Sequence, residues 1–138
     1  MTIEEYFGTL QQSFIEVWKD HLSTAKYSDH KALNDYYDDI VDAVDTLIEN
    51  WQGKYGKTGE LKNTMSTEVN KPVEYLESLR DFTITGRDEL ISKEDTELWS
   101  DIDTILSIID STIYKLKELS ESNIVSLKSF LYEHLEKE

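Results

Sequence analysis

The chain has 138 residues, enough for one domain with its own hydrophobic core, and 38% of them are hydrophobic. Its 29 acidic residues outnumber 14 basic ones, and the net charge of −15 disfavours direct binding to the phosphates of a nucleic acid. The absence of cysteine excludes disulfides and thiolate metal sites and favours a cytoplasmic protein. No apolar run is long enough to span a membrane, and the acidic N-terminus argues against a secretory signal.

Two amphipathic helices are predicted before the first cluster of glycines. The first, over about 3–26, has a stripe at spacings of three and four made of Ile3, Phe7, Leu10, Phe14, Val17, Trp18 and His21. The second, over about 29–51, has a stripe made of Leu33, Tyr37, Ile40, Val44, Leu47 and Trp51, with Val41 and Ile48 beside it. Ser28 stands just before this second helix, where we expect the N-cap.

The middle of the chain is predicted to be a loop. Three glycines, Gly53, Gly56 and Gly59, mark a polar stretch over about 52–70. Pro72 then suits the first turn of a third helix, over about 72–88.

Two further helices are predicted toward the C-terminus. The stretch Ser92-Lys-Glu-Asp95 has the pattern of a capping box that opens a fourth helix, over about 93–119. A short fifth helix, over about 123–136, would present an apolar side made of Ile124, Leu127, Leu131 and Leu135. Strand-like alternation and internal repeats are absent from the sequence. It therefore predicts one all-α domain over 1–138, a four-helix bundle with a short C-terminal helix.

Common catalytic motifs are missing. The stretch Gly56-Lys57-Thr58 superficially resembles the end of a phosphate-binding loop, but Trp51 stands where that motif needs a glycine, and the motif must follow a strand. No serine lies in a Gly-x-Ser-x-Gly elbow. Nucleotide binding and acyl transfer are therefore not expected.

Two of the three histidines are candidate metal ligands. His21 lies on the apolar stripe of the first helix, where a histidine is more often a core residue than a ligand, and His30 opens the second helix, where capping or exposure is the usual role. They stand nine residues apart across a short turn, so their imidazoles could face each other where the helices meet. Imidazole together with carboxylate suits first-row divalent metals, iron among them.

Two carboxylates on the second helix are candidate oxygen ligands. Asp45 and Glu49 are one turn apart and share a face, although such pairs are common on any acidic helix. Because fifteen residues separate His30 from Asp45, a distance of about 22 Å at about 1.5 Å per residue keeps them from one ion within one chain. A second copy lying antiparallel across a two-fold axis would bring them together.

These four positions resemble the ligand pattern of the miniferritins, the DNA-protection-during-starvation (Dps) family of the ferritin-like superfamily. The intervals of fifteen and nineteen residues from His30 to the acidic pair match that pattern. Residues 21–33, followed by Tyr-Tyr-Asp, are similar to the first-turn region of the family. With the run Trp51-Gln-Gly-Lys-Tyr-Gly56, they are also similar to uncharacterised bacteriophage proteins of about this length. The chain departs from typical miniferritins in Leu22, which replaces a tryptophan, in histidines three residues closer together, and in lacking a basic tail.

The resemblance implies a ferritin-like bundle that dimerises about a two-fold axis through its first two helices and builds a larger shell. It implies that His21 and His30 supply nitrogen ligands to iron. Asp45 of the partner subunit and Glu49 of the partner subunit would supply oxygens, with the glutamate bridging two irons. Iron(II) would be oxidised there by peroxide or dioxygen, and the acidic surface would concentrate the incoming cations.

A hypothesis from another class remains open. The chain would then be a non-enzymatic acidic helical phage protein, either a virion component or a decoy that binds a basic host or defence protein. Both histidines would be structural, and the carboxylates of residues 29–51 would form a surface that faces solvent or the partner. In either case we expect the protein in the host cytoplasm or in the virion.

Overall fold

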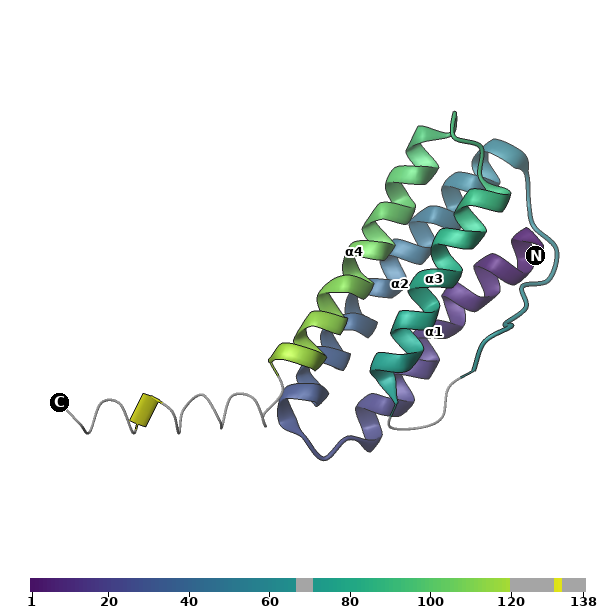
Figure 1. The fold of residues 1–138 in the computed structure, drawn as a ribbon. Helices are drawn as coiled ribbons and strands as arrows, with labels where there is room; N and C mark the ends of the chain where they lie inside the picture. Colours follow the sequence, from purple (N-terminus) through teal and green to yellow (C-terminus); the bar gives the residue numbers. More distant parts are fainter. Residues whose placement is uncertain (67–70, 120–130, 133–138) are drawn as a thin grey trace.

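The computed structural model describes residues 1–66, 71–119 and 131–132. Within these residues the chain is all-helical, as predicted, and forms a four-helix bundle (Figure 1). The helices are α1 (Ile3–Ser23), α2 (Tyr27–Tyr55), α3 (Pro72–Leu90) and α4 (Thr96–Glu118). The predicted fifth helix lies outside the described residues, except for the helical pair Leu131 and Tyr132. None of the described helices combines the length and the apolar composition that a membrane span requires.

The turn between α1 and α2 lies earlier in the chain than predicted, at residues 24–26 instead of about 27–28. Thr2 and Glu5 form a reciprocal capping box that starts α1, and the helix ends at Ser23. The expected cap at Ser28 is wrong, because the backbone N–H of His30 already bonds the carbonyl of Lys26 at 2.9 Å. Lys26 is therefore the N-cap, and Ser28 lies inside the first turn of α2.

Helix α2 continues four residues beyond its predicted end at about residue 51. Gly53 is helical, and the helix ends where Gly56 adopts a φ of 93°, which favours glycine. Just before that end, the Lys54 ammonium and the Tyr55 hydroxyl both donate to the carboxylate of Asp95, on another part of the chain. These contacts hold the last turn of α2 against the start of α4.

The same contacts explain why the predicted capping box at Ser92 is wrong. Asp95 is the N-cap of α4, but its side chain makes no capping hydrogen bond, since both carboxylate oxygens already accept from Lys54 and Tyr55. Lys54 also bonds Glu97 at 3.1 Å. A long-range ion pair has replaced the local cap that the sequence pattern suggested.

The connection from α2 to α3 crosses the length of the bundle beside α1 (Figure 1). We call its residues 56–66 the strap. Two hydrogen bonds hold the strap against α1: the Lys62 N–H donates to the Glu4 carbonyl at 3.1 Å, and the Thr64 N–H donates to Thr9 Oγ1 at 2.9 Å. At Gly8 a side chain would meet the Lys62 backbone at 2.3 Å, so only glycine allows this approach. Because the strap returns to the starting end, α3 runs parallel to α2.

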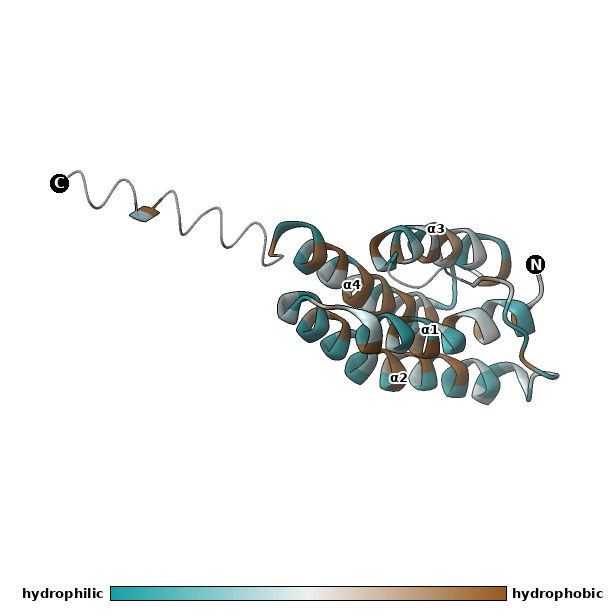
Figure 2. Ribbon diagram, turned by 90° about the horizontal axis from the view of Figure 1, so that it is seen from below, coloured by the Kyte–Doolittle hydropathy of each residue, from teal (hydrophilic) through white to brown (hydrophobic). Residues whose placement is uncertain are grey.

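The four helices enclose one core. Helix α1 packs against α2 and α3, and α4 packs against the same two helices. Figure 2 shows hydrophobic residues recurring along the helices. The largest fully buried side chains are Tyr6, Tyr36, Phe7, Leu10, Leu33, Ile40, Leu47, Leu76, Leu79, Leu98, Ile102 and Ile105. Five of them, Phe7, Leu10, Leu33, Ile40 and Leu47, belong to the apolar stripes that predicted the first two helices.

One row of buried residues was not predicted. Thr9, Ser13, Glu16 and Asp20 are all buried on α1. Ser13 donates to the carbonyl of Leu10 at 2.7 Å and accepts from the Tyr36 hydroxyl at 2.9 Å. A 9-13-16-20 spacing is itself helical, so a second, polar stripe was visible in the sequence, although its burial was not.

Candidate metal-binding site

The turn between α1 and α2 brings His21 and His30 into direct contact. Their ring centroids lie 3.8 Å apart with an angle of 30° between the ring planes. His21 comes from the last turn of α1 and His30 from the first turn of α2, so the short turn at residues 24–26 holds both rings on neighbouring backbones. The two histidines that the sequence proposed as nitrogen ligands therefore do meet within one chain.

A hydrogen bond orients the His30 ring. Its Nδ1 lies 3.1 Å from the main-chain carbonyl oxygen of His21. Since a carbonyl can only accept, this Nδ1 carries the proton and donates, and a neutral His30 then keeps a lone pair on Nε2. Metal-binding histidines are commonly oriented in this way, with one ring nitrogen bonded to a carbonyl and the other free for the ion.

His21 is buried, with 7% of its surface exposed, and neither of its ring nitrogens has a hydrogen-bond partner in the described part of the chain. A buried polar group left without a partner costs about 1–3 kcal/mol. Burial, and next the neighbouring His30, lower the pKa of His21, while the carboxylate of Asp38 acts in the opposite direction. His21 is thus held as a neutral imidazole, the form that binds a metal ion.

Three linked side chains of α2 lie beside this pair, and none of them was predicted to belong to the site. The Tyr37 ring packs edge-on against His21 at 5.1 Å, and its hydroxyl donates to Asn34 Oδ1 at 2.8 Å. Asn34 in turn donates to Asp38 Oδ2 at 3.2 Å. They follow His30 by four, seven and eight residues, a spacing that places them on the same side of α2 as His30. This spacing is the feature of the sequence that could have predicted their place beside the histidines.

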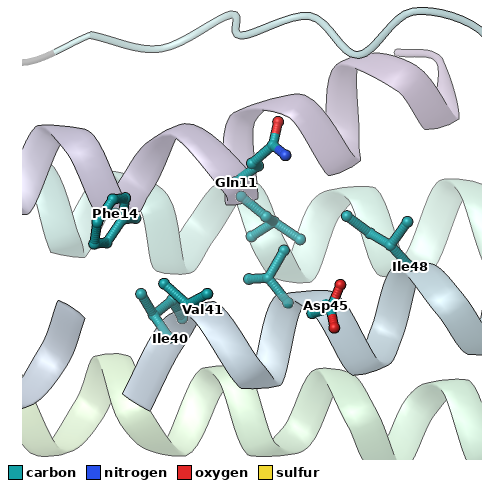
Figure 3. A pocket seen from close by; sticks show the side chains of 8 residues that line it. Gln11, Phe14, Ile40, Val41, Asp45 and Ile48 are labelled. Carbon is teal, nitrogen blue, oxygen red and sulfur yellow. The ribbon is translucent and has the colours of Figure 1, made fainter. Parts of the chain in front are cut away.

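Asp45 and Glu49 lie farther along α2 and are exposed. Asp45 lines a hollow of about 330 Å³ between α1 and α2. Figure 3 shows it beside Val41 and Ile48 of α2, with Phe14 and Gln11 of α1 across the hollow. Within the described residues of one chain, no three histidine, aspartate or glutamate side chains form a group that could hold a metal ion.

The face of the bundle formed by α1 and α2 has apolar residues exposed to solvent. Val41, beside the hollow, is 46% exposed, and Trp18, which stacks on Phe14, is 42% exposed. Leu22, next to His21, is also exposed. The predicted apolar stripe therefore extends past the single-chain core onto an open surface, the α1–α2 face, which we define by these three residues and the hollow of Asp45.

A comparison with protein families gives a match. The model of a family described as "Family of unknown function (DUF5856)" matches residues 21–116, which begin at the first histidine of the pair and end in α4. No curated protein matches the chain. No solved structure matches it either.

Proposed function

The chain belongs to the family of unknown function DUF5856, and we propose that it is a miniferritin-like phage protein that binds iron(II) and oxidises it at a site shared by two subunits. His21 and His30 of one subunit supply nitrogen ligands. Asp45 of the partner subunit and Glu49 of the partner subunit supply oxygen ligands. The protein is then a ferroxidase whose substrate is iron(II).

The observation that carries this proposal is the histidine pair. His30 has one ring nitrogen bonded to a carbonyl, which leaves the other available, and His21 has two buried nitrogens with no hydrogen-bond partner among the described residues. A structural histidine in a core normally has its polar atoms satisfied. A ligand from outside the single chain would bind these nitrogens and remove the free-energy cost of leaving them without a partner. Because the His21 nitrogens are shielded from solvent, we expect an entering ion to displace the exposed ring of His30.

The α1–α2 face supports the two-subunit arrangement. An antiparallel two-fold contact along α2 places the start of one helix against the middle of the other, and the distance from His30 to Asp45 is about 22 Å on each. Exposed Val41 and Trp18 supply apolar surface for such a contact. Asp45 lies beside that surface, where a partner's histidines would approach it.

The topology also supports the proposal. Short turns join α1 to α2 and α3 to α4, whereas one long connection joins α2 to α3 across the bundle. A single long crossover is the connection of ferritin-like bundles. The likeness to ferritin-like bundles also leads us to propose that the dimers assemble into a larger shell.

The chemistry needs an oxidant from solution. Two iron(II) ions each give one electron, and a peroxide takes both, together with two protons, to become two waters. Nitrogen and carboxylate ligands suit both iron states. The net charge of −15 favours the approach of the cation.

The test follows ferric absorbance after iron(II) and peroxide are added to the purified full-length protein. We expect rapid oxidation by the wild type and a loss of the fast phase in His30→Ala and in Asp45→Ala. Asp42→Ala removes an exposed carboxylate of the same helix that lies outside the proposed site, and it serves as the matched control. His134→Ala controls for the loss of a histidine.

Mixing the two inactive variants identifies the shared site. In a random mixture of His30→Ala and Asp45→Ala subunits, one of the two sites in each mixed dimer is intact, so about a quarter of all sites regain activity. A site built within one chain would regain none. A monomer that oxidises iron no faster than buffer would refute the ferroxidase proposal.

A second candidate function rests on the groove between α2 and α4. Asp39, Asp42 and Asp101 line a hollow of about 350 Å³ there. An open acidic groove fits a basic protein partner, as expected of a decoy or a virion component. A dimer that binds no iron, but whose binding to a basic protein is weakened by Asp39→Asn with Asp42→Asn, would favour this function.

A further inference from the structure

The hollow on the α1–α2 face lies next to an exposed tryptophan. Its volume is about 330 Å³, and its walls come from α1 and α2 (Figure 3). Apart from Gln11 and Asp45, the side chains that line it are apolar. Trp18 stacks on Phe14, a residue of the lining, with 5.9 Å between the ring centroids, but Trp18 itself lies outside the lining and is 42% exposed. Each chain therefore has an open apolar hollow and, beside it, a large apolar ring that does not fill it.

Two ring contacts show which residues of α1 and α2 lie at the same level of the bundle. His21 contacts His30 at 3.8 Å, and seven residues away on each helix Phe14 contacts Tyr37 at 5.8 Å. The two helices run antiparallel, so each residue back along α1 corresponds to one residue forward along α2. Trp18 comes three residues before His21. It is therefore level with the position three residues after His30 on α2.

The two-fold register of the proposed metal site places this tryptophan over the hollow of a second copy. That register sets His30 of one subunit opposite Asp45 of the partner subunit. Because the partner helix runs in the opposite direction, the level three residues after His30 lies opposite the level three residues before Asp45. The α2 wall of the hollow extends from Ile40 to Ile48, so the hollow includes this level. The metal ligands alone define the register, and the match of tryptophan to hollow is independent of them.

We propose that Trp18 of each subunit inserts into the hollow of the partner subunit and anchors the dimer. The inference rests on the two-subunit site of the proposed function, and it names the contact that holds the two halves of that site together. Two-fold symmetry repeats the contact, so both hollows are filled and both indoles are covered. A tryptophan in a well-packed pocket is the kind of residue that dominates the free energy of protein association.

Two variants of the metal-free protein should each weaken the dimer. Trp18→Ala removes the anchor, and Val41→Trp fills the hollow from within its own chain, since Val41 lines the hollow and is 46% exposed. We expect each variant to raise the dissociation constant of the dimer about 30-fold or more, as measured by sedimentation equilibrium with a chelator present. Ser100→Trp, at an exposed position of α4, is the matched control and should change this constant by less than about threefold.

Mixing the two variants distinguishes insertion from a general loss or gain of apolar surface. In a mixed dimer, Trp18 of the Val41→Trp subunit meets the open hollow of the Trp18→Ala subunit, and the filled hollow meets no tryptophan. One contact is intact and no clash arises, so mixed dimers should form at concentrations where each variant alone is monomeric. A mixture that stays monomeric at these concentrations would overturn the proposal.

The outcome for the tryptophan can be separated from the outcome for iron. If the wild type is a dimer and both variants dimerise as tightly, the insertion of Trp18 is refuted, while the ferroxidase proposal stands. If both variants dissociate as expected in a protein that oxidises iron(II) no faster than buffer, the insertion stands and the ferroxidase proposal is refuted. A monomeric wild type would overturn both.

Discussion

The imidazole rings of His21 and His30 lie in contact across the turn between α1 and α2, with their centroids 3.8 Å apart. The contact joins a buried ring to an exposed one. Because His21 is buried and lies against a second imidazole, its pKa is lowered and its neutral form is favoured in the folded chain.

The stability of the metal-free protein should therefore fall in mild acid. Burial and His30 lower the pKa of His21 in the folded chain, so below an unfolded-state value of about 6.5 the unfolded chain binds more protons. The wild type should lose free energy of unfolding between about pH 7.5 and 5.5. His21→Phe should lose less, as measured by urea unfolding in the presence of a chelator. An equal loss in both proteins would contradict this prediction.

Gly8 should tolerate no side chain. In Gly8→Ala the added Cβ would lie 2.3 Å from the backbone nitrogen of Lys62, so the strap must move away from α1. We expect a loss of about 1–3 kcal/mol in the free energy of unfolding. Gly53→Ala is the matched control, because it is helical with no neighbour within 4 Å, and it should gain up to about 1 kcal/mol. Chemical denaturation of both variants checks the contrast.

Asp95→Asn should destabilise the protein at neutral pH. Lys54 and Tyr55 lower the pKa of the Asp95 carboxyl by their hydrogen bonds, so the folded state favours its ionised form. The wild type should therefore have the higher denaturation midpoint near pH 7, and this advantage should vanish as pH falls through the lowered pKa of Asp95. Asp42→Asn, at an exposed carboxylate, should leave the midpoint nearly unchanged. A midpoint for Asp95→Asn equal to that of the wild type would show that the ion pair contributes nothing.

Val41→Asp should abolish the proposed dimer. The side chain is 46% exposed on the α1–α2 face, so the substitution spares the core while placing a charge in the contact. Analytical ultracentrifugation should show a dimer or larger assembly for the wild type and a monomer for the variant. Tyr114→Asp, at an exposed hydrophobic residue of α4, should leave the assembly unchanged. Dissociation in both variants would mean that the contact is not specific to this face.

Much of the histidine site could be predicted from the sequence, because it is built across a turn of a few residues. A spacing of nine residues with a helix on either side restricts His21 and His30 to neighbouring positions. Tyr37 and Asn34 could not be assigned in the same way, since their contacts depend on side-chain directions in the folded bundle. Whether Asp45 and Glu49 complete the site depends on a second chain.

The sequence by itself determined the helices and most of the core, because the spacing of apolar residues along a helix is a local property. Only the tertiary structure decided where α2 ends and where α4 begins. The Asp95 carboxylate accepts hydrogen bonds from Lys54 and Tyr55 and does not cap its own helix. It also decided that Glu16 is buried while Val41 is exposed, although valine is the more hydrophobic of the two residues. The physical reason is that burial depends on which segments pack over a residue, and those segments are distant in the sequence.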